Sequence, residues 1–148
     1  MIFLGADHRG FEAKSIVYKF LINNGYDVKD VGAYNHDESD DYNDFAVTVA
    51  RNVRRDKEAF GILICGSGIG MSIQANRFKG VRAVAATDKR LVEISRLDNN
   101  ANVLCLSANV LSTEEIQDLV KTFLTTKFSA EPRHIHRNAR LDEREDYA

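Results

Sequence analysis

Residues 65–70, with the sequence Cys-Gly-Ser-Gly-Ile-Gly, combine a thiol with closely spaced glycines. Alternate glycines let a backbone turn sharply with its N–H groups pointing inward, and such a nest at the start of a helix attracts anions. A lone cysteine is most often a small buried hydrophobic residue. Cys65, however, precedes the glycine-rich turn, a position that favours a thiolate. We therefore interpret Cys65 as a candidate base or nucleophile beside donors that could stabilise an oxyanion.

Two familiar phosphate-binding motifs do not fit this turn. The dinucleotide fingerprint G-x-G-x-x-G would need glycine at position 71, where Met71 stands. A P-loop would need Gly-Lys followed by Ser or Thr, and that sequence does not follow here. The turn therefore argues against a dinucleotide or nucleoside triphosphate site.

Asp7 and His8 directly follow the first apolar run of the chain, at residues 2–6. Asp7 can simply cap the helix that is predicted after it. If the run ends at a ligand-binding edge, the same pair becomes a candidate site. Tyr42, which follows an acidic loop at 33–41, is either a packed aromatic residue or a further part of that site.

The second cysteine and the C-terminal histidines carry weaker signals. Cys105 lies inside an apolar run, so we expect it in the core. His134 and His136 are two residues apart, which is poor spacing for a shared metal ion on a helix. No C-x-x-C motif occurs, and we predict no metal site.

The elements that must position these residues alternate between short apolar runs and segments of helical periodicity. The apolar runs lack polar alternation, as buried parallel strands do. We predict an α/β fold: a three-layer α/β/α sandwich, doubly wound and Rossmann-like, around a five-stranded parallel sheet. The predicted strands are 2–6, 28–31, 62–65, 81–86 and 103–106. The predicted helices are 11–23, 45–53, 71–78, 91–97 and one that opens at Ser112.

Parallel sheets of this kind bind ligands at the carboxyl ends of their strands. That rule selects residues 5–10, residues 65–70, and Thr87 with Asp88 as the places for a site. The two segments that carry Asp7 and Cys65 are therefore expected to lie at the same edge of the sheet.

Size and charge limit the class of protein. A chain of 148 residues is expected to form a single domain, residues 1–148. A net charge of −2 argues against nucleic-acid binding through bulk charge. No run approaches the ~18 apolar residues of a membrane helix, and the first residues lack the basic segment of a signal peptide. With only two cysteines, both expected as free thiols, we predict a cytoplasmic protein.

The chain from about residue 133 is heavily charged, with few apolar residues. Such a C-terminal helix is usually a solvated face. The other interpretation is an arm that packs on a partner subunit and brings Arg133, His134 and Arg137 to the partner's site.

The ordered set of motifs resembles the ribose-5-phosphate isomerase B family, which includes allose-6-phosphate and galactose-6-phosphate isomerases. The resemblance spans nearly the whole chain. It rests on residues 5–10, 41–42, 45–46, 61–70, 75–77, 80–83 and 99–103, and on Arg133, His134 and Arg137.

The resemblance implies an aldose–ketose isomerase that interconverts ribose 5-phosphate and ribulose 5-phosphate in the pentose phosphate pathway, through a cis-enediolate. It makes Cys65 the base, Ser67 a proton shuttle, and Asp7 a residue that holds sugar hydroxyls and helps ring opening. The N–H groups around Gly66, Gly68 and Gly70 would hold the enediolate oxygens. Loss of one such donor typically lowers the reaction rate by about 10²–10³.

The resemblance also assigns residues to the rest of the substrate. His8, Arg133 and Arg137 would bind the phosphate, and Tyr42, Asn99 and His134 would line the pocket. It implies no cofactor. It implies a homodimer or dimer of dimers with active sites shared between chains.

Two positions depart from the family pattern. Asp98 stands where the family usually has a histidine assigned to ring opening, and an ionised carboxylate is a poor acid but a possible base. Asn109 stands where many members have a phosphate-binding arginine, which an amide does not replace, although His8, Arg133, Arg137 or nearby Arg9 could compensate. These departures keep two alternatives open: an isomerase of a six-carbon sugar phosphate, or a non-catalytic sugar-phosphate-binding protein.

Overall fold

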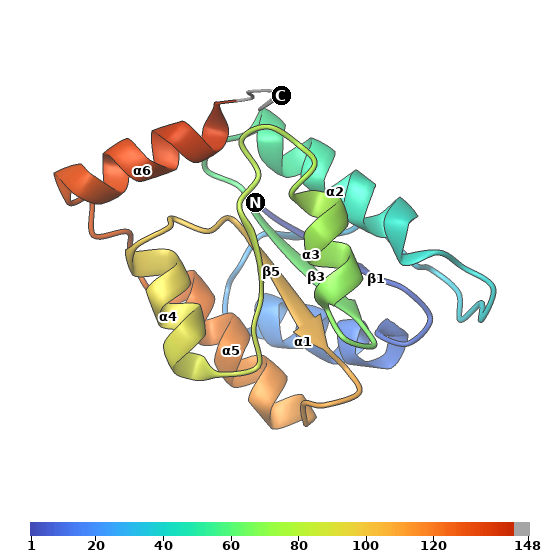
Figure 1. Cartoon of the computed structure of the whole chain (residues 1–148). Helices are drawn as coiled ribbons and strands as arrows, with labels where there is room; N and C mark the ends of the chain where they lie inside the picture. Colours follow the sequence, from blue (N-terminus) through green and yellow to red (C-terminus); the bar gives the residue numbers. More distant parts are fainter. Residues whose placement is uncertain (144–148) are drawn as a thin grey trace.

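The structure, a computed structural model, describes residues 1–143 and confirms the predicted α/β sandwich (Figure 1). Five parallel strands form one sheet in the order β2-β1-β3-β5-β4. The strands are β1 (Ile2–Ala6), β2 (Val28–Asp30), β3 (Phe60–Cys65), β4 (Ala83–Ala85) and β5 (Val103–Ser107). The helices are α1 (Phe11–Asn23), α2 (Tyr42–Arg55), α3 (Ile69–Ala75), α4 (Lys89–Leu97), α5 (Thr113–Thr125) and α6 (Pro132–Asp142).

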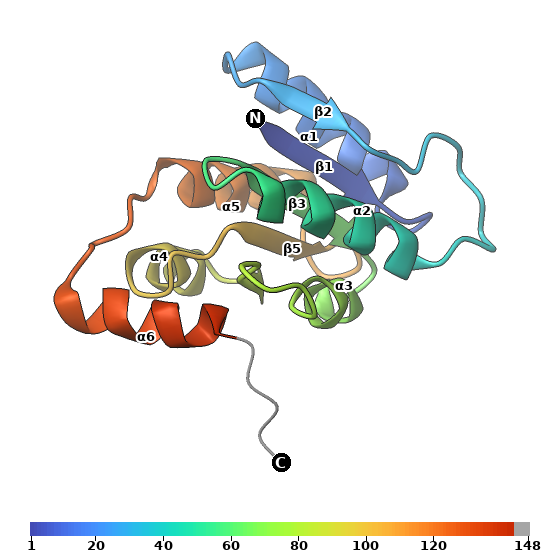
Figure 2. The ribbon, with the colours of Figure 1, turned by 90° about the horizontal axis from the view of Figure 1, so that it is seen from above.

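The two faces of the sheet are covered by different helices, and Figures 1 and 2 show them on opposite sides of the strands. Successive residues of a strand point to opposite faces. In β3, Ile62 and Ile64 therefore pack with α1, α4 and α5, whereas Leu63 and Cys65 pack with α2 and α3. The Cys65 side chain consequently lies on the α2 and α3 side of the sheet.

Several predicted element boundaries differ from those of the structure, and local contacts explain the differences at α3. The helix predicted at 71–78 begins earlier, at Ile69, because Gly68 adopts a left-handed conformation (φ 77°) that ends the turn there. It ends at Ala75 because the Asn76 side chain bonds the N–H and C=O of Ala83, at 2.8 and 2.9 Å. The strand predicted at 81–86 contains only 83–85.

Helix α6 lies outside the three layers and contacts the end of α4 (Figure 2). The Asn138 amide donates to the Asp98 carbonyl at 3.1 Å, and Arg82 forms an ion pair with Asp142 at 2.8 Å. Two of its apolar side chains, Ile135 and Leu141, remain exposed. Among residues 1–143, no helix is both long enough and apolar enough to cross a membrane.

The turn between β1 and α1 is pressed against β3. Gly10 precedes α1, and a Cβ at this position would lie 2.2 Å from the carbonyl oxygen of Ile64. Asp7 does not cap α1: its carboxylate instead accepts hydrogen bonds from the N–H groups of Arg9 (2.9 Å) and Gly10 (3.1 Å). The side chain stabilises the turn that precedes the helix.

We expect Gly10→Ala to lower the free energy of unfolding by about 2–3 kcal/mol, because the backbone of β3 cannot move away from the added methyl group. Gly25→Ala is the control, since position 25 has open space and only its positive φ opposes a side chain, at about 1 kcal/mol. Urea unfolding followed by circular dichroism measures both. A loss in Gly10→Ala no larger than in Gly25→Ala would contradict the close packing.

Candidate active site

A cavity of about 500 Å³ opens at the carboxyl ends of β1 and β3. Its walls come from three separate segments, 7–9, 38–42 and 65–70, and from Asn109 after β5. Two of the three segments that were predicted to bind a ligand, 5–10 and 65–70, therefore contribute to this cavity. Thr87 and Asp88 do not line this cavity.

The thiol of Cys65 lies inside the glycine-rich turn. Cys65 ends β3 with 4% of its surface exposed, and the Gly68 N–H donates to its sulfur at 3.1 Å. The N–H of Ile69 donates to the Ser67 hydroxyl at 3.2 Å. A Cβ at Gly68 would lie 3.1 Å from the Cys105 carbonyl, so glycine is required here both by contact and by its φ.

The end of β5 holds this turn in place. The buried Ser107 hydroxyl donates to the Gly66 carbonyl at 2.6 Å, and the Asn109 N–H donates to the same oxygen at 3.1 Å. A Cβ at Gly70 would lie 2.6 Å from Cζ of Tyr42, so the Tyr42 ring lies directly against the turn. The predicted pocket residue Tyr42 thus reaches the cavity from the start of α2.

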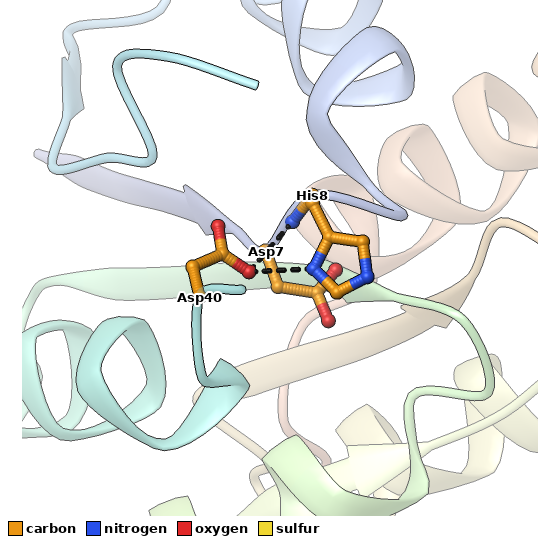
Figure 3. A group of neighbouring side chains, drawn as sticks. All are labelled: Asp7, His8 and Asp40. Atoms are coloured by element: carbon orange, nitrogen blue, oxygen red, sulfur yellow. Dashed lines mark hydrogen bonds and ion pairs between the residues drawn. The ribbon is translucent and has the colours of Figure 1, made fainter. Parts of the chain in front are cut away.

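On the β1 side, a histidine and two carboxylates lie together (Figure 3). Asp7 is 5% exposed, and one oxygen of Asp40 accepts hydrogen bonds from both the N–H (3.1 Å) and Nδ1 (2.7 Å) of His8. The hydrogen bond to Asp40 raises the pKa of His8, the charge of Asp7 adds to this, and partial burial opposes it. His8 therefore favours its cationic form at the rim of the cavity.

Asp7, His8 and Asp40 form the one group within residues 1–143 whose ligand atoms are close enough to share a metal ion, all within 4.8 Å. Some of their polar atoms already bond within the protein: His8 Nδ1 bonds one oxygen of Asp40, and one oxygen of Asp7 accepts two backbone N–H groups. The prediction that no metal is used stays a prediction.

The second cysteine is a core residue, as predicted. Cys105 is 1% exposed, and both cysteines are free thiols. Burial raises the pKa of the Cys105 thiol, and the nearby Cys65 contributes a smaller increase. Cys105 is thus held neutral while Cys65 faces the cavity.

The structure leaves the C-terminal candidates outside this cavity. Asn99 lines a separate cavity of about 410 Å³ beside Arg82 and Leu141. His134 Nε2 lies 3.5 Å from an oxygen of Asp98, at the contact between α4 and α6. Arg133, which pairs with Glu131 at 3.1 Å, and Arg137 are exposed on α6. Within one chain, Cys65 therefore does not share a cavity with Asp98, Asn99, Arg133, His134 or Arg137.

Three acidic residues of the cavity were not assigned to the site from the sequence. They are Glu38, Asp40 and Asp41, and they belong to the loop 33–41, whose composition is typical of a polar surface segment. The pairing of Asp40 with His8 spans 32 residues, and no local periodicity indicates it. The one feature of the sequence that could have indicated their place in the site is that this loop directly precedes the candidate residue Tyr42.

The chain is similar to known sugar-phosphate isomerases. A family model described as Ribose/Galactose Isomerase matches residues 2–141. The probable ribose-5-phosphate isomerase B of Mycoplasma pneumoniae is 36% identical, over 95% of this chain and 91% of its own. D-erythrulose-4-phosphate isomerase 2 of Mycolicibacterium smegmatis is 40% identical, over 86% of this chain and 85% of its own.

A solved structure has the same fold. Ribose-5-phosphate isomerase B from Mycoplasma genitalium, with bound ribulose-5-phosphate, superposes with a TM-score of 0.92 at 37% identity. The match covers 95% of this chain and 93% of that one.

Proposed function

Because the chain belongs to the ribose/galactose isomerase family, we propose that it interconverts ribose 5-phosphate and ribulose 5-phosphate, with Cys65 as the base. The observation that carries the proposal is the position of Cys65, which lines the cavity and whose sulfur accepts the Gly68 N–H. The binding of ribulose-5-phosphate by the Mycoplasma genitalium relative supports the substrate class. Both thiols are free, which suits the cytoplasm, and we place the activity there. The proposed substrate places it in the pentose phosphate pathway.

The reaction is a proton transfer between neighbouring carbons and needs no oxidant. The Cys65 thiolate removes the proton from C2 of the open-chain aldose, and the electron pair forms the double bond of a cis-enediolate. The N–H groups around Gly66, Gly68 and Gly70 stabilise the enediolate oxygens. Ser67 moves a proton between O1 and O2, and Cys65 returns its proton to C1. Asp7 holds the sugar hydroxyls and helps ring opening.

We propose that Arg9 supplies the phosphate contact for which many family members use an arginine at position 109. Arg9 and Asn109 both lie over Gly66, because a Cβ there would be 2.9 Å from Arg9 Cδ and 2.9 Å from Asn109 Nδ2. The Arg9 guanidinium therefore occupies the wall of the cavity next to His8. Two adjacent cations at one rim suit a phosphate dianion.

We further propose that the chain acts as a homodimer or dimer of dimers, in which α6 and the loop after α4 complete the partner's cavity. The side chains of Asp98, after α4, and His134, on α6, lie side by side, so both could enter the same cavity of a partner subunit. The exposed Ile135 and Leu141 supply apolar area for such packing. In this arrangement Arg133 and Arg137 bind the partner's phosphate, and Asp98, Asn99 and His134 face the partner's sugar.

A different sugar phosphate is the second candidate substrate. The relative from Mycolicibacterium smegmatis is named for a four-carbon sugar phosphate, and Asp98 departs from the family's usual histidine. Six-carbon allose or galactose 6-phosphate are the further alternatives. A non-catalytic sugar-phosphate-binding protein is less favoured, because Cys65, Ser67 and the glycine turn all line the cavity.

The proposed function predicts isomerase activity on ribose 5-phosphate that depends on Cys65. Cys65→Ala should lower kcat by about 10²–10⁴, because the base is lost while the binding groups remain. Cys105→Ala is the matched control and should stay active, since Cys105 does not line the cavity. Exchange of the C2 proton with deuterated solvent measures the chemical step directly.

Competition assays rank the possible substrates. In each assay, ribose 5-phosphate competes with allose 6-phosphate, galactose 6-phosphate or erythrulose 4-phosphate. A Cys65→Ala variant with full activity would refute the base assignment. Binding of ribose 5-phosphate without turnover of any of these sugars would favour the non-catalytic alternative.

Exchanging the arginine between positions 9 and 109 tests the phosphate contact. Arg9→Ala should raise KM about ten-fold or more, with a smaller change in kcat, because a charge-assisted hydrogen bond to the phosphate is lost. Adding Asn109→Arg in the same chain should recover most of the affinity. Arg90→Ala, which removes an exposed arginine of α4, is the control. An unchanged KM in Arg9→Ala would exclude the contact.

Mixed dimers test the shared site. One chain carries Cys65→Ala and the other Arg133→Ala with Arg137→Ala, and two affinity tags isolate the heterodimer. One of its two sites then keeps both its cysteine and its arginines, so about half of the wild-type activity should return. If each site belonged to one chain, the heterodimer would be as inactive as the two parents.

A further inference from the structure

The contact between His8 and Asp40 has a consequence for substrate binding. We propose that Asp40 is a positioning residue that holds the His8 ring with Nδ1–H toward itself and stabilises the imidazolium, whose Nε2–H then donates to the substrate phosphate. The inference rests on the proposed function, in which His8 binds that phosphate. The new element is Asp40, whose role is to set the tautomer and the charge of His8.

The geometry fixes the ring at two points. A single oxygen of Asp40 accepts from the His8 backbone N–H at 3.1 Å and from Nδ1 at 2.7 Å. Both side chains are largely shielded, with 23% of His8 and 11% of Asp40 exposed. Figure 3 shows the second ring nitrogen, Nε2, on the side of the ring away from Asp40.

The bond to Asp40 decides which proton His8 can lose. Because Nδ1–H donates to a carboxylate, deprotonation takes the proton from Nε2. A bare Nε2 is an acceptor and cannot bond a phosphate oxygen, whereas the protonated ring donates from Nε2. His8 therefore binds phosphate only in its cationic form.

The surroundings favour that cation. The hydrogen bond to Asp40 raises the pKa of His8 most, and the charges of Asp7 and Asp40 raise it further, while burial and Arg9 lower it. His36, whose ring centroid lies 6.4 Å from that of His8, and Asp37 belong to the loop that packs against it. The other oxygen of Asp40 is buried without a hydrogen-bond partner among residues 1–143. A buried carboxylate needs a compensating charge, and within the described chain His8 is the group that supplies it.

The pH dependence of KM tests the proposal. Asp40→Asn keeps the size and an acceptor oxygen but removes the negative charge. Phosphate affinity is present below the pKa of His8 and is lost as the pH rises through it. Asp40→Asn lowers this pKa, so the loss should begin at lower pH, and KM near neutral pH should rise about ten-fold with a smaller change in kcat. The assay is run between about pH 6.5 and 9, where the substrate phosphate is a dianion.

Asp37→Asn is the matched control. It removes one negative charge from the same loop, where Asp37 bonds Ser39 rather than His8. Its KM and pH profile should follow those of the wild-type protein. A shift of equal size in Asp37→Asn would mean that loop charge, rather than the bond to His8, sets the affinity.

A measurement without substrate separates this inference from the proposed function. NMR titration of the His8 ring, assigned with His8→Gln, should show the Nδ1–H tautomer at high pH and a titration midpoint that Asp40→Asn moves to lower pH. Inorganic phosphate should raise that midpoint in the wild-type protein. Absence of isomerase activity would refute the proposed function while leaving this titration informative. An unchanged midpoint in Asp40→Asn, or an Nε2–H tautomer in the wild-type protein, would overturn the role of Asp40.

Discussion

The site depends on a backbone contact between the turn after β1 and the end of β3. The Asp7 N–H donates to the Ile64 carbonyl at 3.3 Å, and Gly10 lies so close to the same carbonyl that no side chain fits. This contact brings Asp7 and His8 beside Cys65, although they are almost sixty positions away in the chain. A parallel pairing of β1 with β3 ends both strands at one edge, so the contact follows from the sheet itself.

Charged groups of both signs surround this contact. Asp7 and Asp40 line the same cavity as His8 and Arg9, and Cys65, whose sulfur accepts the Gly68 N–H, lines it too. One hydrogen-bonded pair, His8 with Asp40, attaches the acidic loop to the end of β1. The loop therefore contributes to the electrostatics of the site as well as to its shape, which a polar surface segment would not do.

In a single chain, the proposed base Cys65 shares the cavity with His8 and Arg9, whereas the other candidate residues lie outside it. Asp98 and His134 meet at the contact of α4 with α6, and Arg133 and Arg137 are exposed on that helix. Ile135 and Leu141 of α6 are exposed, and the proposed second copy of the chain would cover them. Membership of the ribose/galactose isomerase family is shown by the match over residues 2–141, whereas the roles of the base and the phosphate ligands are proposals that the family resemblance implies.

Apolar periodicity and the positions of glycines are local properties of the chain, so they predict the five strands, the alternation of strand and helix, and the strand-end position of Cys65. The same local pattern distinguishes Cys105, inside an apolar run, from Cys65; both are buried, and of the two only Cys65 lines the cavity. The bounds of α3 required the three-dimensional structure, because the left-handed Gly68 ends the turn before Ile69 and Asn76 ends the helix by bonding Ala83. Only the tertiary structure joined Asp40 to His8 and separated Asn99 from Cys65, because contacts between distant loops depend on how strands are ordered in the sheet, and no local residue pattern encodes that order.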